Sequence, residues 1–290
     1  MKYKNNLEIL ILGGGFIAGE LGIFLKKNFS TKVFTRKEID FSKTNSILKF
    51  KKYCNINSLI FISAARAPVK NKKMFDYNIR IMKNILKCIR VTNYKKIIYL
   101  SSDAVYSDTL KKINEASKTN PSSLHGKMHL DREIMLQKVI KDNNKLLILR
   151  PTLVYGPSDP HNGYGPNKFI RAAKFLNEIS LFGKGEEKRD HIYIGDLVKL
   201  ISQLLELDAS GIFNICTGKV VSFKKIMVSV QKAINKNIYI NYIPRIGPLP
   251  HLGYRSFNIN KIRKTLNKFN FVNLEKKFIK KISAKYRKFE

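Results

Sequence analysis

The sequence predicts an α/β protein with a doubly wound parallel sheet and a smaller C-terminal lobe. Up to Pro151, short apolar runs alternate with segments of helical periodicity, which is typical of strands joined by right-handed helical crossovers. A cluster of glycines directly follows the first apolar run, and after Pro151 loops and shorter elements replace the alternation. The 290 residues suffice for one large α/β domain or two smaller ones.

The first element is the apolar run Ile9–Leu12, which leads into the glycines Gly13–Gly15 and then into an apolar segment with helical spacing. A strand, a tight turn and a helix in this order bind nucleotide phosphates, because the first N–H groups of the helix are unpaired and glycines let a pyrophosphate approach the backbone. The spacing Gly13-x-Gly15-x-x-Ala18 fits the dinucleotide-binding fingerprint, with alanine in third place. We therefore predict a Rossmann-type domain, although a glycine-rich turn of an ordinary βα unit would show the same motif.

The elements that follow are assigned from the same two periodicities. We expect strands at Lys32–Thr35, Ser58–Ser63, Lys96–Ser101 and Lys145–Arg150, and helices at Ser42–Tyr53, Asn71–Thr92 and Leu124–Lys141. Ser42 is the expected N-cap of its helix, since serine side chains accept hydrogen bonds from the first unpaired N–H groups. Three residues separate the second strand from Ile39–Phe41, so no helix fits between them.

Beyond Pro151 the expected elements are helices at Asp196–Leu207 and Leu274–Arg287 and a strand at Gly211–Cys216. The last of these helices is amphipathic and rich in lysine. We assign residues 1–155 to the dinucleotide-binding domain and residues 156–290 mainly to the substrate-binding lobe. The segment at about residues 192–217 is expected to return to the first domain.

The net charge is the unusual feature of the composition, because 55 Lys and Arg against 21 Asp and Glu give +34. Such a charge favours anionic partners, among them nucleic acid and a nucleotide-bearing substrate. The lysines are spread along the chain together with many Asn and Ile, so a compositional bias explains the charge about as well. We expect no nucleic acid partner, and no apolar run approaches the length of a membrane span. The three scattered cysteines lack metal-ligand spacing and predict buried thiols in a cytoplasmic protein without a metal site.

In open parallel sheets, ligands bind at the carboxyl ends of the strands. The sequence turns small, polar or glycine-rich at five expected strand ends, namely Gly13–Ile17, Thr35–Arg36, Ser63–Arg66, Ser101–Tyr106 and Pro151–Tyr155. This agreement supports a ligand site at that edge of the sheet more strongly than any single motif does.

Seven stretches carry a family resemblance: GGGFIAGEL, FISAA, YNIRIMKNIL, YLSSDAVY, LRPTLVYGP, LFGKGEEKRDHIYIGDL and FNICTG. Over nearly its whole length, the chain resembles extended short-chain dehydrogenases/reductases of the NAD-dependent epimerase/dehydratase family, whose members act on nucleotide sugars. The short connection after the second strand resembles the dTDP-4-dehydrorhamnose reductase branch. The resemblance implies an NAD(P)-dependent epimerase, reductase or dehydratase of a nucleotide-diphosphate sugar, serving cell-surface polysaccharide synthesis and acting as a homodimer.

The resemblance also implies the cofactor-binding residues Gly13, Gly15, Phe16, Ile17, Arg36, Asp40, Ala64, Ala65, Asn78, Ser101, His129 and Pro151. The end of the second strand indicates which cofactor binds. An acidic residue there would bond the adenosine ribose of NAD, but Thr35, Arg36 and Lys37 occupy the position. Because arginine pairs bidentately with phosphate, we expect NADP(H) in preference to NAD(H). Stacking of Arg36 on adenine is the alternative and would permit either cofactor.

The catalytic segment departs from the family pattern, in which a Ser or Thr precedes a Tyr-x-x-x-Lys helix. Ser102 matches the Ser/Thr position, whereas His125 stands in the place of the Tyr and His129 in that of the Lys. Residues i and i+4 share a helix face, so both rings can point into one site. A histidine titrates near neutral pH, so His125 can carry the proton while Ser102 orients the substrate oxygen and His129 bonds the ribose. A degenerate, non-catalytic binding protein on the same fold is the alternative.

For the nucleotide sugar, the resemblance implies the contact residues Asp103, Asn167 and Arg189. The planar guanidinium of Arg189 is suited to clamping the diphosphate. The loop Asp159–Gly165 either contacts the sugar or is a plain surface loop. His191 and His251 have no assigned partner, and we expect ordinary core or surface histidines there.

Overall fold

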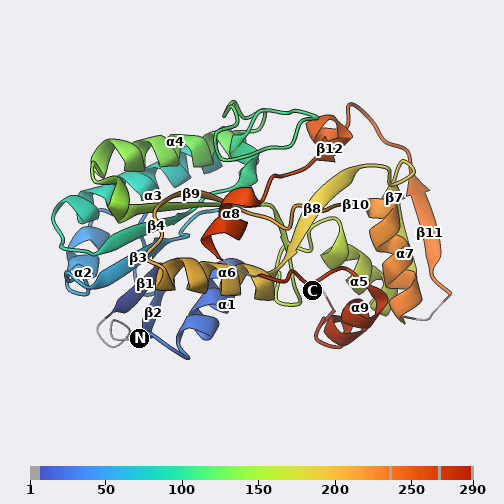
Figure 1. Cartoon of the computed structure of the whole chain (residues 1–290), viewed down its shortest axis with the longest axis horizontal. Helices are drawn as coiled ribbons and strands as arrows, with labels where there is room; N and C mark the ends of the chain where they lie inside the picture. Colours follow the sequence, from blue (N-terminus) through green and yellow to red (C-terminus); the bar gives the residue numbers. More distant parts are fainter. Residues whose placement is uncertain (1–6, 235–236, 267–268, 289–290) are drawn as a thin grey trace. The chain divides into compact units, whose positions relative to one another are not determined.

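The computed structural model describes residues 7–234, 237–266 and 269–288 (Figure 1). The chain forms two compact units, each assembled from segments that are separate in the sequence. Unit 1 consists of Met1–Ser107, Glu115–Pro151 and Val198–Ile215. Unit 2 consists of Asp108–Asn114, Thr152–Leu197 and Cys216–Glu290.

The described residues of unit 1 form a parallel sheet of six strands in the order β2-β1-β3-β4-β5-β9. The strands are β1 (Glu8–Leu12), β2 (Ser30–Phe34), β3 (Ser58–Ile62), β4 (Lys96–Leu100), β5 (Leu146–Pro151) and β9 (Gly211–Ile215). β1 pairs with β2 along one edge and with β3 along the other, so the strand order reverses there. Open α/β sheets bind ligands at such a switch point, outside the carboxyl ends of the strands. The predicted doubly wound parallel sheet is confirmed.

Helices cover both faces of this sheet (Figure 1). They are α1 (Phe16–Leu25), α2 (Ser46–Lys51), α3 (Lys72–Arg90), α4 (Leu124–Val139) and, from Val198 onward, α6 (Ile194–Glu206). α3 and α4 lie on one face, and α1 and α6 on the other. Because the sheet is covered on both sides, β3 is buried at every residue, and its sequence SLIFI is apolar apart from the serine.

The helix predicted at Ser42–Tyr53 is shorter than expected and begins only at Ser46. The predicted cap is wrong, because the Ser42 hydroxyl donates to Asp40 Oδ1 at 2.7 Å and so belongs to a turn before the helix. The other elements predicted in unit 1 are present, with ends shifted by one or two residues.

The described residues of unit 2 form two small sheets and four helices (Figure 1). In the first sheet, β8 (Lys188–Tyr193) lies between β10 (Val220–Ser222) and β12 (Tyr254–Arg255), and β6 (Leu153–Tyr155) also pairs with β8. In the second, β7 (Glu178–Phe182) pairs in parallel with β11 (Tyr239–Ile243). The helices are α5 (Pro166–Phe175), α7 (Phe223–Ile234), α8 (Asn260–Thr265) and α9 (Lys276–Ser283). Their apolar core includes Phe169, Phe223 and Ile279.

The last helix also differs from its prediction, because α9 ends at Ser283 rather than at Arg287. Lys174 on α5 donates from Nζ to the carbonyl oxygens of Ser283 at 3.1 Å and Tyr286 at 2.8 Å. An ammonium group that binds several carbonyls at the end of a helix replaces the missing N–H donors there and allows the helix to stop. No helix in the described part of the chain is long and apolar enough to cross a membrane.

Candidate functional site

The glycine turn of unit 1 forms an open cradle at the switch point of the sheet. Gly13 has φ +113°, and a Cβ placed on it would lie 2.9 Å from both the Ala64 nitrogen and the Ser63 hydroxyl oxygen. Gly15 is the N-cap of α1 and has no side-chain cap, and a Cβ on it would meet no atom within 4 Å. The start of α1 therefore presents N–H groups to open space beside the end of β3. This arrangement fits the diphosphate of a dinucleotide.

The end of β2 carries charges of both signs. Arg36 is exposed, and its Nε lies 3.4 Å from Asp40 Oδ2. Asp40 also accepts from the Ser42 backbone and hydroxyl; burial acts to raise the pKa of Asp40, but these bonds and Arg36 outweigh it and the pKa is lowered. Sequence reasoning missed Glu38, whose Oε2 accepts from the Thr35 N–H at 2.6 Å and therefore places a carboxylate next to the strand end.

The loop after β3 is held from behind by two buried side chains. Asn78 on α3 is fully buried; its Oδ1 accepts from the Arg66 N–H at 2.7 Å and its Nδ2 donates to the Arg66 carbonyl at 2.9 Å. Arg132 on α4 donates from Nη2 to the Ala64 carbonyl at 2.9 Å. Asn78 thus shapes the loop that contains Ala64 and Ala65, and a direct contact of Asn78 with the cofactor stays a prediction.

The two serines after β4 have different partners. Ser101 donates to Glu133 Oε1 at 2.5 Å, and Glu133 forms a buried ion pair with Arg150, so the Ser101 hydroxyl is bound inside unit 1. Ser102 caps the short helix η2 (Asp103–Val105) by accepting from the Ala104 N–H at 3.2 Å, and it is only half-buried. Pro151, the end of β5, is buried.

His125 and His129 lie on one face of α4, as their spacing predicts. Their ring centroids are 4.7 Å apart and the rings meet edge to face. Burial lowers the pKa of His125, although Asp103 opposes this effect. Burial, together with His125 and Arg132, puts the pKa of His129 well below its usual value. Both imidazoles are therefore uncharged at neutral pH.

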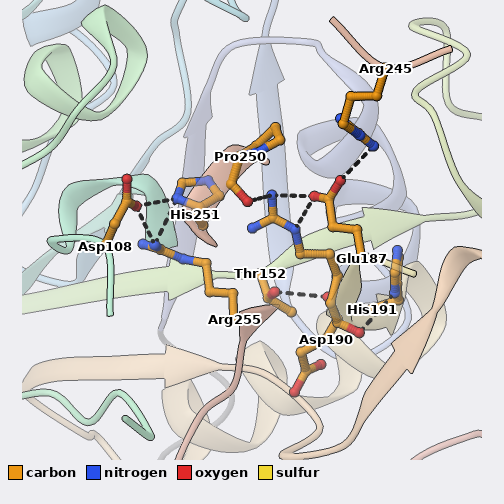
Figure 2. Close-up of polar contacts among 10 residues, drawn as sticks. Asp108, Thr152, Glu187, Asp190, His191, Arg245, Pro250, His251 and Arg255 are labelled. Atoms are coloured by element: carbon orange, nitrogen blue, oxygen red, sulfur yellow. Dashed lines mark hydrogen bonds and ion pairs between the residues drawn. The ribbon is translucent and has the colours of Figure 1, made fainter. Parts of the chain in front are cut away.

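In unit 2, a buried carboxylate joins two arginines (Figure 2). Arg189 on β8 donates from Nε to Glu187 Oε1 at 2.8 Å and from Nη2 to the Pro250 carbonyl at 3.2 Å. Arg245 donates to the other Glu187 oxygen at 3.1 Å. Sequence reasoning identified Arg189 but missed Glu187 and Arg245, because 58 residues separate this pair in the chain.

Next to this group, Asp108 accepts from two cationic or polar donors (Figure 2). His251 Nδ1 lies 2.5 Å from Asp108 Oδ1, and Arg255 Nη1 lies 3.3 Å from the same oxygen. The structure thus gives His251 a partner, which the sequence left unassigned. Arg255 on β12 is in register with Arg189 on β8, so the fold brings both guanidinium groups to one part of unit 2.

His191, on the same strand as Arg189, is buried as a core histidine would be. Its Nδ1–H donates to the Arg189 carbonyl at 3.2 Å, and burial lowers its pKa to about 3. Its Nε2 has no hydrogen-bond partner among the described residues. Asp190, the residue between them, is occupied by structural bonds, since it accepts from the Thr217 N–H and hydroxyl.

The loop Asp159–Gly165 is built around buried polar groups. Asn167 donates to Asp159 Oδ2 at 2.6 Å, and its own oxygen accepts from the Gly156 N–H at 3.0 Å and the Tyr286 hydroxyl at 2.7 Å. Asn167 therefore braces this loop, and its contact with a substrate stays a prediction.

Comparisons with known proteins agree with this fold. A family model described as the NAD dependent epimerase/dehydratase family matches residues 25–216. An N-acetyl-alpha-D-glucosaminyl-diphospho-ditrans,octacis-undecaprenol 4-epimerase of Escherichia coli O157:H7 is 27% identical over 190 residues, which cover 64% of this chain and 56% of that protein. A dTDP-4-dehydro-6-deoxyglucose reductase of Escherichia coli is 28% identical over 201 residues, which cover 65% of this chain and 62% of that protein. The chain thus spans 56% and 62% of the length of these two relatives.

Solved structures share the fold over nearly the whole chain. A UDP-glucose 4-epimerase from Thermotoga maritima, solved with UDP-glucose, has a TM-score of 0.83 at 21% identity and covers 96% of this chain and 98% of its own. RMD from Pseudomonas aeruginosa, complexed with NADPH, has a TM-score of 0.81 at 16% identity with the same coverage. At these identities the likeness shows the fold alone. Since the family model matches more than half of its residues, the chain belongs to the NAD-dependent epimerase/dehydratase family.

Proposed function

We propose that this chain is an NAD(P)-dependent epimerase, reductase or dehydratase of a nucleotide-activated sugar, in the synthesis of a cell-surface polysaccharide. The observation that carries the proposal is the uncapped start of α1 at the switch point between β1 and β3. In this proposal, residues 1–155 bind the dinucleotide and residues 156–290 mainly bind the nucleotide sugar. The bound nicotinamide would exchange a hydride with a carbon of the sugar.

NADP(H) remains the favoured cofactor. The support is that Arg36 is exposed at the end of β2 and bears a guanidinium that can pair with a 2′-phosphate. Glu38 and Asp40 at the same strand end favour the ribose hydroxyl of NAD(H) instead. Comparing the dissociation constants of NADPH and NADH decides between the two cofactors.

The diphosphate of the substrate would bind in unit 2 at the arginine cluster. The cluster brings the three guanidinium groups of Arg189, Arg245 and Arg255 together with the carboxylates Glu187 and Asp108. Planar guanidinium groups match the oxygens of a diphosphate. The high net charge of the chain would also attract an anionic substrate.

For the chemistry, His125 would accept the proton of a sugar hydroxyl while Ser102 bonds the same oxygen. His125 can do this because its lowered pKa keeps it uncharged at neutral pH. The half-buried Ser102 caps η2, against which the start of α4 packs.

The test is to purify the protein, identify any bound nicotinamide nucleotide, and follow nicotinamide absorbance with UDP-, dTDP- and GDP-sugars. We expect turnover with one of these classes and its loss by at least about 100-fold in His125→Ala, the range for removal of an acid–base group. Lys127→Ala, an exposed change on another face of α4, is the matched control. Turnover by His125→Ala at the wild-type rate would show that His125 carries no proton.

A non-catalytic cofactor-binding protein is the second candidate. Two hydrogen bonds favour it: the Ser101 hydroxyl is bound by Glu133, and the His129 ring by Tyr99. Both side chains are thus engaged within the protein. This candidate predicts tight binding of cofactor and nucleotide sugar without any change in nicotinamide absorbance across the same sugar panel.

A further inference from the structure

Arg132 is a fully buried cation to which the described residues supply no counter-ion. Its side chain is inaccessible to solvent, and no carboxylate of the described chain forms an ion pair with it. Its guanidinium donates to the Ala64 carbonyl, lies 5.2 Å from the centre of the Tyr99 ring, and leaves Nε without a partner among the described residues. Arg150 on β5 is instead neutralised by Glu133, the residue that follows Arg132 on α4. A buried charge without a counter-ion costs several kcal/mol, so its retention calls for a role.

Tyr99 connects this cation to His129. The Tyr99 hydroxyl is fully buried, and His129 Nδ1, at 2.7 Å, is its hydrogen-bond partner in the described chain. If Nδ1 carried a hydrogen, the hydroxyl hydrogen of Tyr99 would be left unpaired in the core, which is unfavourable. The hydroxyl therefore donates to Nδ1, and neutral His129 carries its hydrogen on Nε2. His129 thus offers an uncharged N–H donor on the side away from Tyr99.

Three of the side chains involved lie on one face of α4. His125, His129 and Arg132 stand at positions i, i+4 and i+7 of α4, which share a face. The charged or titratable groups around His129 are His125 and Arg132 from α4 and Tyr99 from β4, while Asp103 of η2 acts on His125 and Glu133 acts on Tyr99. Of the groups that act on His129, Arg132 is the one that carries the guanidinium charge.

We propose that two side chains of α4 together replace a single ammonium group that would contact the cofactor. His129 is the neutral donor to a ribose hydroxyl, and Arg132 is the fixed cation behind it. The inference rests on the proposed function and deepens it. Arg132 acts as a positioning residue: it holds the carbonyl of Ala64 beside the glycine cradle and supports the ring of Tyr99, which orients His129.

The test, on the full chain, removes the positive charge at residue 132, replaces it there with lysine, or moves it to residue 129. The variants are Arg132→Met, Arg132→Lys, and the double variant His129→Lys/Arg132→Met, with exposed Lys127→Met as the control. Dissociation constants for NADH and NADPH are measured by fluorescence, with thermal midpoints to follow folding. We expect about tenfold weaker binding in Arg132→Met, and binding within about threefold of wild type in Arg132→Lys and in the double variant, since a tenfold change is an ordinary effect of one charged contact.

Two results would overturn the inference: wild-type binding by Arg132→Met, or weak binding that neither lysine restores, which would mean a purely structural role.

A second experiment needs no cofactor and uses the nitrogen NMR shifts of the imidazoles. We expect hydrogen on Nε2 of His129 in the wild type and a higher pKa of His129 in Arg132→Met, because a like charge is removed. Hydrogen on Nδ1, or an unchanged pKa, contradicts the inference. Failure of the wild type to bind either nucleotide would instead overturn the proposed function.

Discussion

At the scale of single residues, His191 shows how burial alone changes a side chain. The ring packs edge to face against Phe223, and Nδ1–H is fixed by the Arg189 carbonyl. Burial lowers the pKa of His191 from 6.5 to about 3, so the folded chain holds this ring neutral where an unfolded chain would protonate it.

This difference predicts a pH-dependent stability. Between pH 6.5 and about 3, the unfolded state binds a proton at His191 and the folded state does not, so the free energy of unfolding falls as pH falls. We expect His191→Phe to remove up to about 1.4 kcal/mol of this slope per pH unit. Urea unfolding of both proteins at several pH values measures it, with the exposed His161→Gln as control. Parallel curves for wild type and His191→Phe would contradict the pKa assignment.

At the scale of elements, the contact between α4 and η2 positions the candidate catalytic residues. Gly126, next to His125, lies so close to η2 that a Cβ on it would come within 2.0 Å of the Ala104 carbonyl oxygen and 2.7 Å of Pro121 Cβ. Ser123 caps the same helix end by accepting from the Gly126 N–H at 3.1 Å. The glycine is therefore required by a close approach of two backbones.

We expect Gly126→Ala to lower the free energy of unfolding by about 1–3 kcal/mol, the usual cost of overpacking, and to move His125 away from Ser102. The matched control is Gly19→Ala on α1, where a Cβ meets no atom within 4 Å and should add stability through the better helix propensity of alanine. Denaturant unfolding measures both. Equal stability of Gly126→Ala and wild type would mean that the two elements separate easily.

At the scale of the whole molecule, the dominant property is the charge of +34. Like charges repel one another more strongly in the folded chain than in the expanded unfolded chain, and salt screens this repulsion.

The thermal midpoint should therefore rise when KCl is increased from about 20 to about 300 mM, a range in which the screening length falls by more than half. Each kcal/mol gained corresponds to roughly 2–4 °C for a chain of this size class. Calorimetry or circular dichroism measures the shift, and sorbitol, which is uncharged, is the control. A midpoint that does not move with salt would show that the ion pairs already balance the lysines locally.

The sequence by itself determined the order and approximate limits of the strands and helices in the parallel sheet, because a strand covered on both faces must be apolar along its length, as Ser58–Ile62 is. It also located the glycine turn and the shared face of His125 and His129, since these depend on residues close together in the chain. Only the tertiary structure decided which polar side chains contact one another across long stretches of the chain. Asp108 meets His251 across 143 residues, and Arg132 meets Ala64 across 68. Such pairs depend on strand order and helix packing, which local patterns do not encode, and they decide which polar groups lie together in the candidate site.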